Sequence, residues 1–367
     1  MRQHVTRGWL SAIGFVLAIA PGLPAQDANR SIITVASTVP SNGDVNPYGV
    51  AMVPVTTGNL VEGHILVSNF NNSSNLQGTG TTIVDIAPNG TVSLFAWIDG
   101  SSLPGPCPGG VGLTTALVAL RAGFVVVGSL PTTDGMSDTA QAGCLLVLNS
   151  SGAVVETIVN NLINGPWDMT AFDMGATADL FVTNVLNGTV AANGSVVDEG
   201  TVVRVNLAFP SAANPVVVSL TTIGSGFAER TDPAALVIGP TGLGLSPDWS
   251  VLYVADSLNN RIASIANPTT RTSTAGIGVT VSQGPHLNDP LGVTVWPGNG
   301  NILSVNGNNG LLVETTPGGA QLSTKLLDKS GTPPGAGALF GLAPAPQGLY
   351  FVDDATNTLN LLAGIHP

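Results

Sequence analysis

Short apolar segments rich in Val, Leu and Ile alternate with Gly, Asn, Asp and Pro along most of the chain, and one phrase recurs six times. Each copy contains an apolar strand, a turn, a second strand that ends in Asp, Asn or Gly, another turn and a third strand. The clearest copy spans residues 240–265, and the others begin at Gly49, Gly112, Asp168, Gly292 and Gly341. Repeats built only of strands predict a ring of small antiparallel sheets, which is an all-β six-bladed β-propeller.

The strand pattern places the blades near residues 47–97, 108–160, 164–223, 236–282, 288–328 and 336–364. Only three strands are left for the sixth blade, whereas the alternating segment Ser31–Ser37 has no blade of its own. We therefore expect residues 31–37 to join the last blade as its outermost strand, because closing the ring in this way removes an open sheet edge. The alternative is a frayed N-terminal arm.

The segment at 253–262, YVADSLNNRI, resembles an NHL repeat, and most of the chain resembles a six-bladed NHL-type propeller. The motif is weaker in the other blades, and blade two departs most, with Gly128 where Asp or Asn is expected. The resemblance implies an architecture rather than an activity, because propellers carry many unrelated functions.

Blade four also resembles the gluconolactonase and regucalcin type of propeller, at Gly244–Asp248 and Leu252–Asp256. That resemblance implies a divalent cation at the channel mouth, held by carboxylate and amide oxygens. The family's Pro-Asn-Gly and Pro-Asp-Gly phrases read here Pro240-Thr241-Gly242 and Pro290-Leu291-Gly292, and blade one has Tyr48 instead of a glutamate. We therefore expect no metal cofactor. The alternative is a metal-dependent lactonase or ester hydrolase that holds a cation such as calcium through Asn184, Asp256 and Asp353.

The residue before each innermost strand is expected to ring the mouth of the central channel. These residues are Tyr48, Val111, Trp167, Thr241, Leu291 and Phe340, and three of them are aromatic in a chain that is only 5% aromatic. Long polar loops at 70–80, 129–143 and 185–200 are expected to form a wall on the same face. We predict ligand contacts from Tyr48, Trp167, Phe340, Asn184 and Asp256. The alternatives are that the aromatic rings only pack the channel and that the Asp and Asn side chains cap turns.

Arg2 and Arg7 precede an apolar stretch, and Ala25 offers a small residue for cleavage, so residues 1–25 are expected to be a signal peptide. The remaining residues 26–367 are expected to be a single propeller domain exported to the periplasm or the extracellular space. The two cysteines, Cys107 and Cys144, then predict one disulfide, with two free buried thiols as the alternative.

The formal net charge of −12 excludes nucleic acid and anionic membranes as favourable partners. The chain has only four histidines and no Gly-x-Ser-x-Gly elbow, phosphate loop or dinucleotide fingerprint. An acid–base pair of Asp168 and Asp173 lacks an evident nucleophile or base partner. We therefore expect a monomeric binding module for a neutral small molecule, a glycan or a protein loop, and catalytic residues stay unassigned. We expect Trp167→Ala and Tyr48→Ala to weaken binding without lowering the melting temperature.

Overall fold

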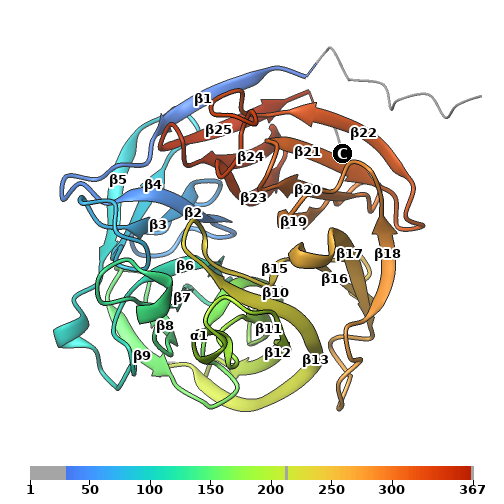
Figure 1. Cartoon of the computed structure of the whole chain (residues 1–367). Helices are drawn as coiled ribbons and strands as arrows, with labels where there is room; N and C mark the ends of the chain where they lie inside the picture. Colours follow the sequence, from blue (N-terminus) through green and yellow to red (C-terminus); the bar gives the residue numbers. More distant parts are fainter. Residues whose placement is uncertain (1–29, 211–213, 365–367) are drawn as a thin grey trace, which may run out of the picture.

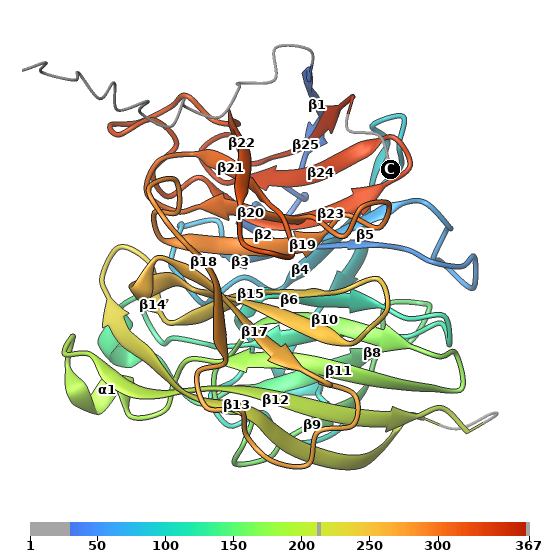
Figure 2. The same cartoon turned by 90° about the vertical axis from the view of Figure 1, so that its right-hand side faces the viewer.

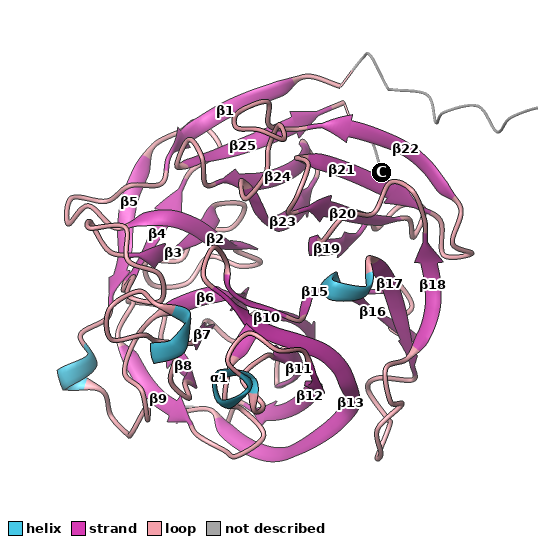
Figure 3. Cartoon of the chain, in the orientation of Figure 1, coloured by secondary structure: helices cyan, strands magenta, loops and turns pink. Residues whose placement is uncertain are grey.

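The computed structural model describes residues 30–210 and 214–364, which form six antiparallel sheets arranged around one axis (Figure 1). The sheets stack as blades when the molecule is viewed from the side (Figure 2), and almost all regular structure is strand (Figure 3). The prediction of an all-β six-bladed propeller is confirmed. The expected signal peptide at 1–25 lies outside the described residues.

Blade one contains β2 (Val45–Met52), β3 (Ile65–Asn71), β4 (Thr82–Ile86) and β5 (Val92–Trp97). Blade two contains β6 (Leu113–Ala119), β7 (Val125–Ser129), β8 (Cys144–Leu148) and β9 (Val154–Ile158). Blade three contains β10 (Pro166–Asp173), β11 (Thr177–Asn184), β12 (Val197–Ala208), β13 (Val216–Asp232) and β14 (Leu236–Ile238).

Blade four contains β15 (Pro240–Leu245), β16 (Val251–Asp256), β17 (Arg261–Ala266) and β18 (Val279–Gln283). Blade five contains β19 (Pro290–Val295), β20 (Ile302–Asn306), β21 (Leu311–Thr315) and β22 (Gln321–Leu326). Blade six contains β23 (Leu339–Ala345), β24 (Gly348–Asp353), β25 (Thr358–Ala363) and β1 (Ile32–Ser37). Short helical turns lie at α1 (Thr189–Ala192), η1 (Gly100–Ser102), η2 (Ser137–Thr139) and η3 (Ser257–Asn259).

The first and last strands of the described chain pair with each other and close the ring. β1 runs antiparallel to β25, with Ile32 opposite Leu362 and Ser37 opposite Thr358. The Thr34 hydroxyl also donates to Asn360 Oδ1 at 2.9 Å. The expected closure by residues 31–37 is therefore confirmed, and the strand is not a frayed arm.

Blade three differs from the sequence prediction, which ended it at residue 223 and began blade four at 236. β13 continues to Asp232 and then turns back into β14, which pairs with β13 through Arg230–Ile238 and Asp232–Leu236. Residues 236–238 therefore belong to the third sheet. The hairpin is anchored because Leu236 and Val237 are buried in the apolar cluster that contains Trp167.

The two cysteines form the predicted disulfide, with 5.4 Å between the Cα atoms of Cys107 and Cys144. It links the connection entering blade two to the start of β8, so the alternative of two free thiols is wrong. Within the described ranges, no helix is long and apolar enough to cross a membrane.

Candidate ligand-binding site

The face on which the inner strands begin holds a cavity of about 1070 Å³ over the central axis. Its floor is apolar, and loops from several blades surround it. The floor residues are Tyr48, Trp167, Leu291 and Phe340, four of the six positions expected at the channel mouth. A volume of this size suits a small-molecule ligand, since such sites are commonly clefts of several hundred cubic ångströms.

The aromatic floor is one stacked cluster that closes the channel. The ring of Tyr48 stacks between Phe340, at a centroid distance of 3.8 Å, and Phe70, at 4.4 Å. Trp167 meets Tyr48 edge-on at 6.0 Å and is only 2% exposed. The rings therefore do pack the channel, as the alternative reading held, while the same residues line the cavity. Ligand contact by Tyr48, Trp167 and Phe340 stays a prediction.

Asn184 and Asp256 are fully buried and do not line this cavity. Arg261 Nε donates to Asp256 Oδ2 at 2.7 Å, and Asn259 Nδ2 also donates to this carboxylate. The amide nitrogen of Asn184 donates to the carbonyl of Val182 in its own strand at 3.5 Å. A buried carboxylate needs a partner, and Arg261 supplies one inside the blade.

Asp353, the third residue of the alternative cation site, caps a turn. Its Oδ1 accepts from the amide nitrogen of Thr356 at 3.1 Å, and it does not line the cavity. In the described part of the chain, no group of three His, Cys, Asp or Glu is arranged to hold a metal ion. The Thr241 hydroxyl is already bonded to Ser257 Oγ at 2.8 Å. These residues therefore do not fit the cation site that the gluconolactonase resemblance implied.

The wall of the cavity differs from the prediction. Blade one contributes Asn71, Ser73, Asn75 and Gln77, as expected, but no residue of the loops at 129–143 or 185–200 lines the cavity. The β13–β14 hairpin lines the cavity in their place, through residues such as Arg230, Ala235 and Val237. The 185–200 loop bonds to this hairpin, since the amide of Gly194 donates to Thr231 Oγ1 at 3.0 Å, whereas the 129–143 loop bonds to blade one, where Thr132 Oγ1 donates to the carbonyl of Gln77 at 2.6 Å. The short turns of blades four to six complete the wall, which the sequence analysis did not foresee.

Many wall residues carry side-chain amides, which both donate and accept hydrogen bonds. The set comprises Asn46, Asn71, Asn75, Gln77, Asn260, Asn288, Asn308 and Asn357. With its amide nitrogen toward Asp354, Asn46 donates to that carboxylate and accepts from Asn71 Nδ2 at 3.0 Å. The wall therefore presents paired, orientable amides around an aromatic floor.

Four charged residues of the cavity were missed by the sequence analysis. Arg230 and Asp232, both on β13, form an ion pair at 2.7 Å, and Asp289 and Asp354 stand on the loops before β19 and after β24. The sequence could have indicated Asp354, because it directly follows Asp353, the residue that ends the second strand of blade six. Asp353 is the last residue of β24 and does not line the cavity, whereas Asp354 does, because successive residues of an extended segment point to different sides.

Burial, with a smaller effect of the neighbouring Asp353, raises the pKa of Asp354 to about 7. Burial and then the charge of Asp232 raise the pKa of Asp289 to about 6, against a lowering by Arg230. Burial and the charge of Asp354 raise the pKa of Tyr48 well above its usual value. Near neutral pH Asp289 is therefore mostly ionised and accepts hydrogen bonds, whereas Asp354 is ionised in only part of the molecules and can also donate one when protonated.

No family model matches the chain, and no curated protein matches its sequence. Solved structures of gluconolactonase-type and regucalcin-type propellers are similar to it. A gluconolactonase from Xanthomonas campestris has a TM-score of 0.56 and 14% identity, covering 95% of this chain and 98% of that one. A luciferin-regenerating enzyme has a TM-score of 0.57 and 12% identity, covering 92% and 96%. A calcium-binding regucalcin from Agrobacterium tumefaciens has a TM-score of 0.50 and 11% identity, covering 91% and 97%. At these identities, the likeness shows that the chain has the fold of these propellers.

Proposed function

We propose that this protein is a binding module that takes a neutral, hydroxyl-bearing small molecule or glycan into the cavity above Tyr48. The observation that carries the proposal is the combination of a stacked aromatic floor with a wall of side-chain amides. Sugar rings have apolar faces and hydroxyl edges, so a flat aromatic surface surrounded by amides suits both. A protein loop with apolar side chains and polar backbone groups could make the same contacts with the aromatic floor and the amides.

The charge of the molecule and of the cavity supports a neutral ligand. The chain carries a net charge of −12, and three of the four charged cavity residues are acidic. Anionic ligands would meet repulsion from Asp232, Asp289 and Asp354, whereas a neutral ligand would not.

Assignment to the NHL-repeat family is part of this proposal, supported by segment 253–262 of blade four. Export of the protein is also part of this proposal, and the disulfide between Cys107 and Cys144 is compatible with it.

Saturation-transfer NMR with a panel of neutral mono- and disaccharides and uncharged aromatic compounds tests the binding proposal. Asn308→Ala and Asn288→Ala remove two wall amides, of which Asn308 is exposed and donates to Asn288 Oδ1 at 3.3 Å. We expect each variant to weaken binding of a hit by about tenfold or less, as for one or two hydrogen bonds. Asn89→Ala, in the exposed β4–β5 turn, is the matched control and should bind as the parent does. Equal loss in all three variants would contradict the proposal.

Lactone or ester hydrolysis is the second candidate, because the fold is shared with gluconolactonases. The donor set described above does not fit the cation that the resemblance of blade four implies, so the metal-dependent form needs ligands other than Asn184, Asp256 and Asp353. Elemental analysis of purified protein and a lactone and ester panel, with and without chelator, test this candidate. Chelator-sensitive turnover would favour it over a pure binding function, whereas bound sugar without turnover would exclude it for that panel.

A further inference from the structure

A second cavity, of about 440 Å³, lies along the inner strands on the other side of the aromatic floor. Trp167 lines the first cavity, and the next residue, Asp168, lines the second. The second cavity continues to the far ends of the inner strands, where Arg121, Asp173 and Trp249 line it. The aromatic cluster thus separates two sites that open on opposite faces of the ring.

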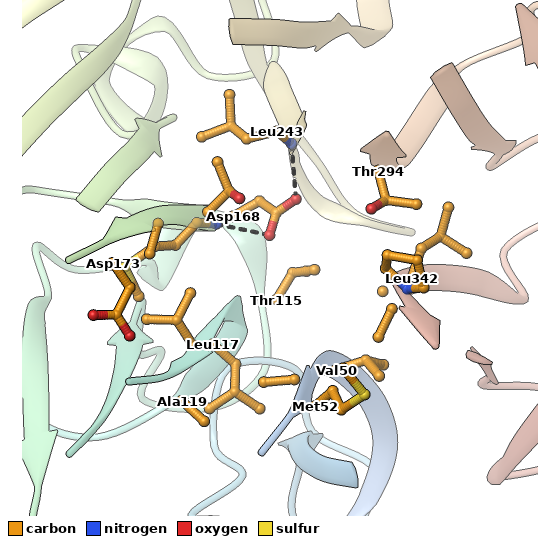
Figure 4. A pocket seen from close by; sticks show the side chains of 18 of the residues that line it. Val50, Met52, Thr115, Leu117, Ala119, Asp168, Asp173, Leu243, Thr294 and Leu342 are labelled. Atoms are coloured by element: carbon orange, nitrogen blue, oxygen red, sulfur yellow. Dashed lines mark hydrogen bonds between the residues drawn. The ribbon is translucent and has the colours of Figure 1, made fainter. Parts of the chain in front are cut away.

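Most side chains that line the second cavity are apolar, and Figure 4 shows Val50, Met52, Leu117 and Leu342 around it, but polar atoms make up more than half of the surface exposed to the cavity. Asp168 is the one acidic residue placed deep within it, close to the aromatic floor. The carboxylate accepts from the amide nitrogen of Met169 at 2.7 Å and from that of Leu243 at 3.1 Å (Figure 4). Each oxygen keeps a further lone pair, and the side chain points toward the cavity beside Thr115 and Thr294.

Asp168 is the exception within the repeat. The residue that follows the mouth position is glycine in the other five blades, at Gly49, Gly112, Gly242, Gly292 and Gly341. Glycine is required there because inner strands approach closely: a Cβ at Gly242 would collide with the carbonyl oxygen of Leu291, and one at Gly292 with that of Phe340. Blade three alone has a carboxyl at this position, and that residue lines the second cavity. A structural role alone does not require it, since glycine suffices in the other blades.

The Asp168 carboxyl also lacks a cationic partner. Among the ion pairs of the described residues, none includes Asp168, which is 8% exposed. Burial raises its pKa to about 7, against lowering by the two backbone hydrogen bonds. The other titratable residues of the cavity are Arg121 and Asp173, at the far end of the inner strands. A buried carboxylate without a cationic partner gains most from a ligand that brings its own positive charge.

We propose that this second cavity binds an apolar primary amine, whose ammonium group pairs with Asp168 while its hydrocarbon part lies against the inner strands. The volume and the apolar side chains such as Val50, Leu117 and Leu342 suit a short aliphatic or aromatic body, and Asp168 sets the position of the charged end. This site is independent of the neutral-ligand cavity on the opposite face. The two cavities share no lining residue, so each can be tested without the other.

Three six-carbon probes that differ only in their head group test the proposal: hexylamine, hexan-1-ol and hexanoate. Met52 and Met169 line the cavity, whereas Met136 is 53% exposed and lies outside it, so ¹³C-methyl methionine NMR reports both affinity and place. We expect hexylamine to shift the Met52 and Met169 signals saturably, at least tenfold more tightly than hexan-1-ol, with no binding of hexanoate. Equal affinity for hexylamine and hexan-1-ol would overturn the proposal, as would equal shifts at Met136.

Asp168→Gly restores the residue that the other blades use, so it is the variant expected to fold, and Asp168→Asn is its shape-conserving companion. Both should weaken hexylamine binding at least tenfold. Ala171→Phe narrows the cavity while Asp168 is unchanged, and it should weaken the binding of every probe that binds the parent protein. Asp138→Asn removes one exposed negative charge elsewhere and is the control for general attraction of cations. Unchanged binding in Asp168→Gly, or a comparable loss in Asp138→Asn, would refute the assignment.

Hexylamine binding should also depend on pH. With a pKa of about 7, Asp168 is mostly neutral at pH 6 and mostly ionised at pH 8, whereas an alkylamine stays protonated throughout. The affinity of the parent protein is therefore expected to rise by about tenfold from pH 6 to pH 8. Asp168→Asn should show no such rise, and an equal rise in this variant would contradict pairing through Asp168.

Discussion

The ring of Tyr48, on the first inner strand, stacks on that of Phe340, on the last, at a centroid distance of 3.8 Å. This contact joins the two ends of the propeller ring in space and forms the floor of the larger cavity. The two rings therefore serve packing and cavity shape together. Variants that remove a whole ring cannot separate the two roles, which revises our expectation for Trp167→Ala and Tyr48→Ala.

Trp167→Ala is expected to destabilise the protein, because the indole is only 2% exposed and packs against Tyr48 and Phe70. The cost should be about 3–5 kcal/mol, as for other buried aromatic residues truncated to alanine. Urea unfolding measures it. Tyr48→Phe keeps the aromatic ring and removes only the hydroxyl. Its free energy of unfolding should lie within about 1 kcal/mol of the parent's, so this variant is the better probe of ligand contact. A Trp167→Ala protein with the same free energy of unfolding as the parent would show that the indole does not stabilise the propeller.

Removing β1 should open the ring. A chain that begins at Thr38 loses the five residue pairings with β25 and is expected to lose about 3 kcal/mol or more, since each hydrogen bond contributes about 1 kcal/mol net. The bared edge of β25 should also promote association, visible by size-exclusion chromatography. Ile33→Thr is the control, because Ile33 is 49% exposed and the substitution keeps the strand. Equal stability of the chains beginning at Arg30 and Thr38 would contradict this role.

Breaking the bond between Cys107 and Cys144 should destabilise the protein by roughly 4 kcal/mol in the chain-entropy model. The closed loop spans a sequence separation of 37 residues, and the chain contains no other cysteine. Thermal unfolding with and without a reducing agent measures the effect directly. The double variant Cys107→Ser with Cys144→Ser should melt like the reduced parent and ignore the reducing agent. A reduced parent with an unchanged melting temperature would show that the disulfide does not contribute.

Stability should fall with rising pH because of Glu229, which is fully buried and accepts from the amide of Asn187 at 2.9 Å. Burial, with a smaller effect of Glu199, raises its pKa to about 8. An acid with a raised pKa is held neutral in the folded state, so its contribution is full below its ordinary pKa and is lost as pH rises to about 8. The raised pKa values of Asp168 and Asp354 should likewise lower the stability of the fold as pH rises to about 7.

Glu229→Gln removes this titration and should raise the melting temperature relative to the parent at pH 9 by about 3 °C or more, with a smaller or no gain at pH 5. Glu62→Gln, at an exposed position, is the control and should change neither value. Differential scanning calorimetry across pH 5–9 gives the comparison. A parent stability that is flat over this range would contradict the buried acid at Glu229.

The strand pattern of the sequence determined the six-bladed fold, because alternating apolar residues and glycine turns recur at a regular spacing. It also determined the ring closure by residues 31–37, since one alternating strand had no blade and blade six lacked one strand. The pairing of Cys107 with Cys144 followed because the chain holds only these two cysteines. Each of these conclusions depends on order along the chain, which the sequence contains directly.

Only the tertiary structure decided which side chain meets which cavity. Successive residues of a strand point to opposite sides, so a displacement by one residue reverses the assignment. The irregular pairing between Pro166 and Met169 is such a place, and there Trp167 and Asp168 line different cavities. Likewise Asp256 turns inward to Arg261, whereas Asp354, rather than Asp353, meets the cavity. Bulges and hairpins such as β13–β14 depend on contacts between blades, and a local pattern does not encode those contacts.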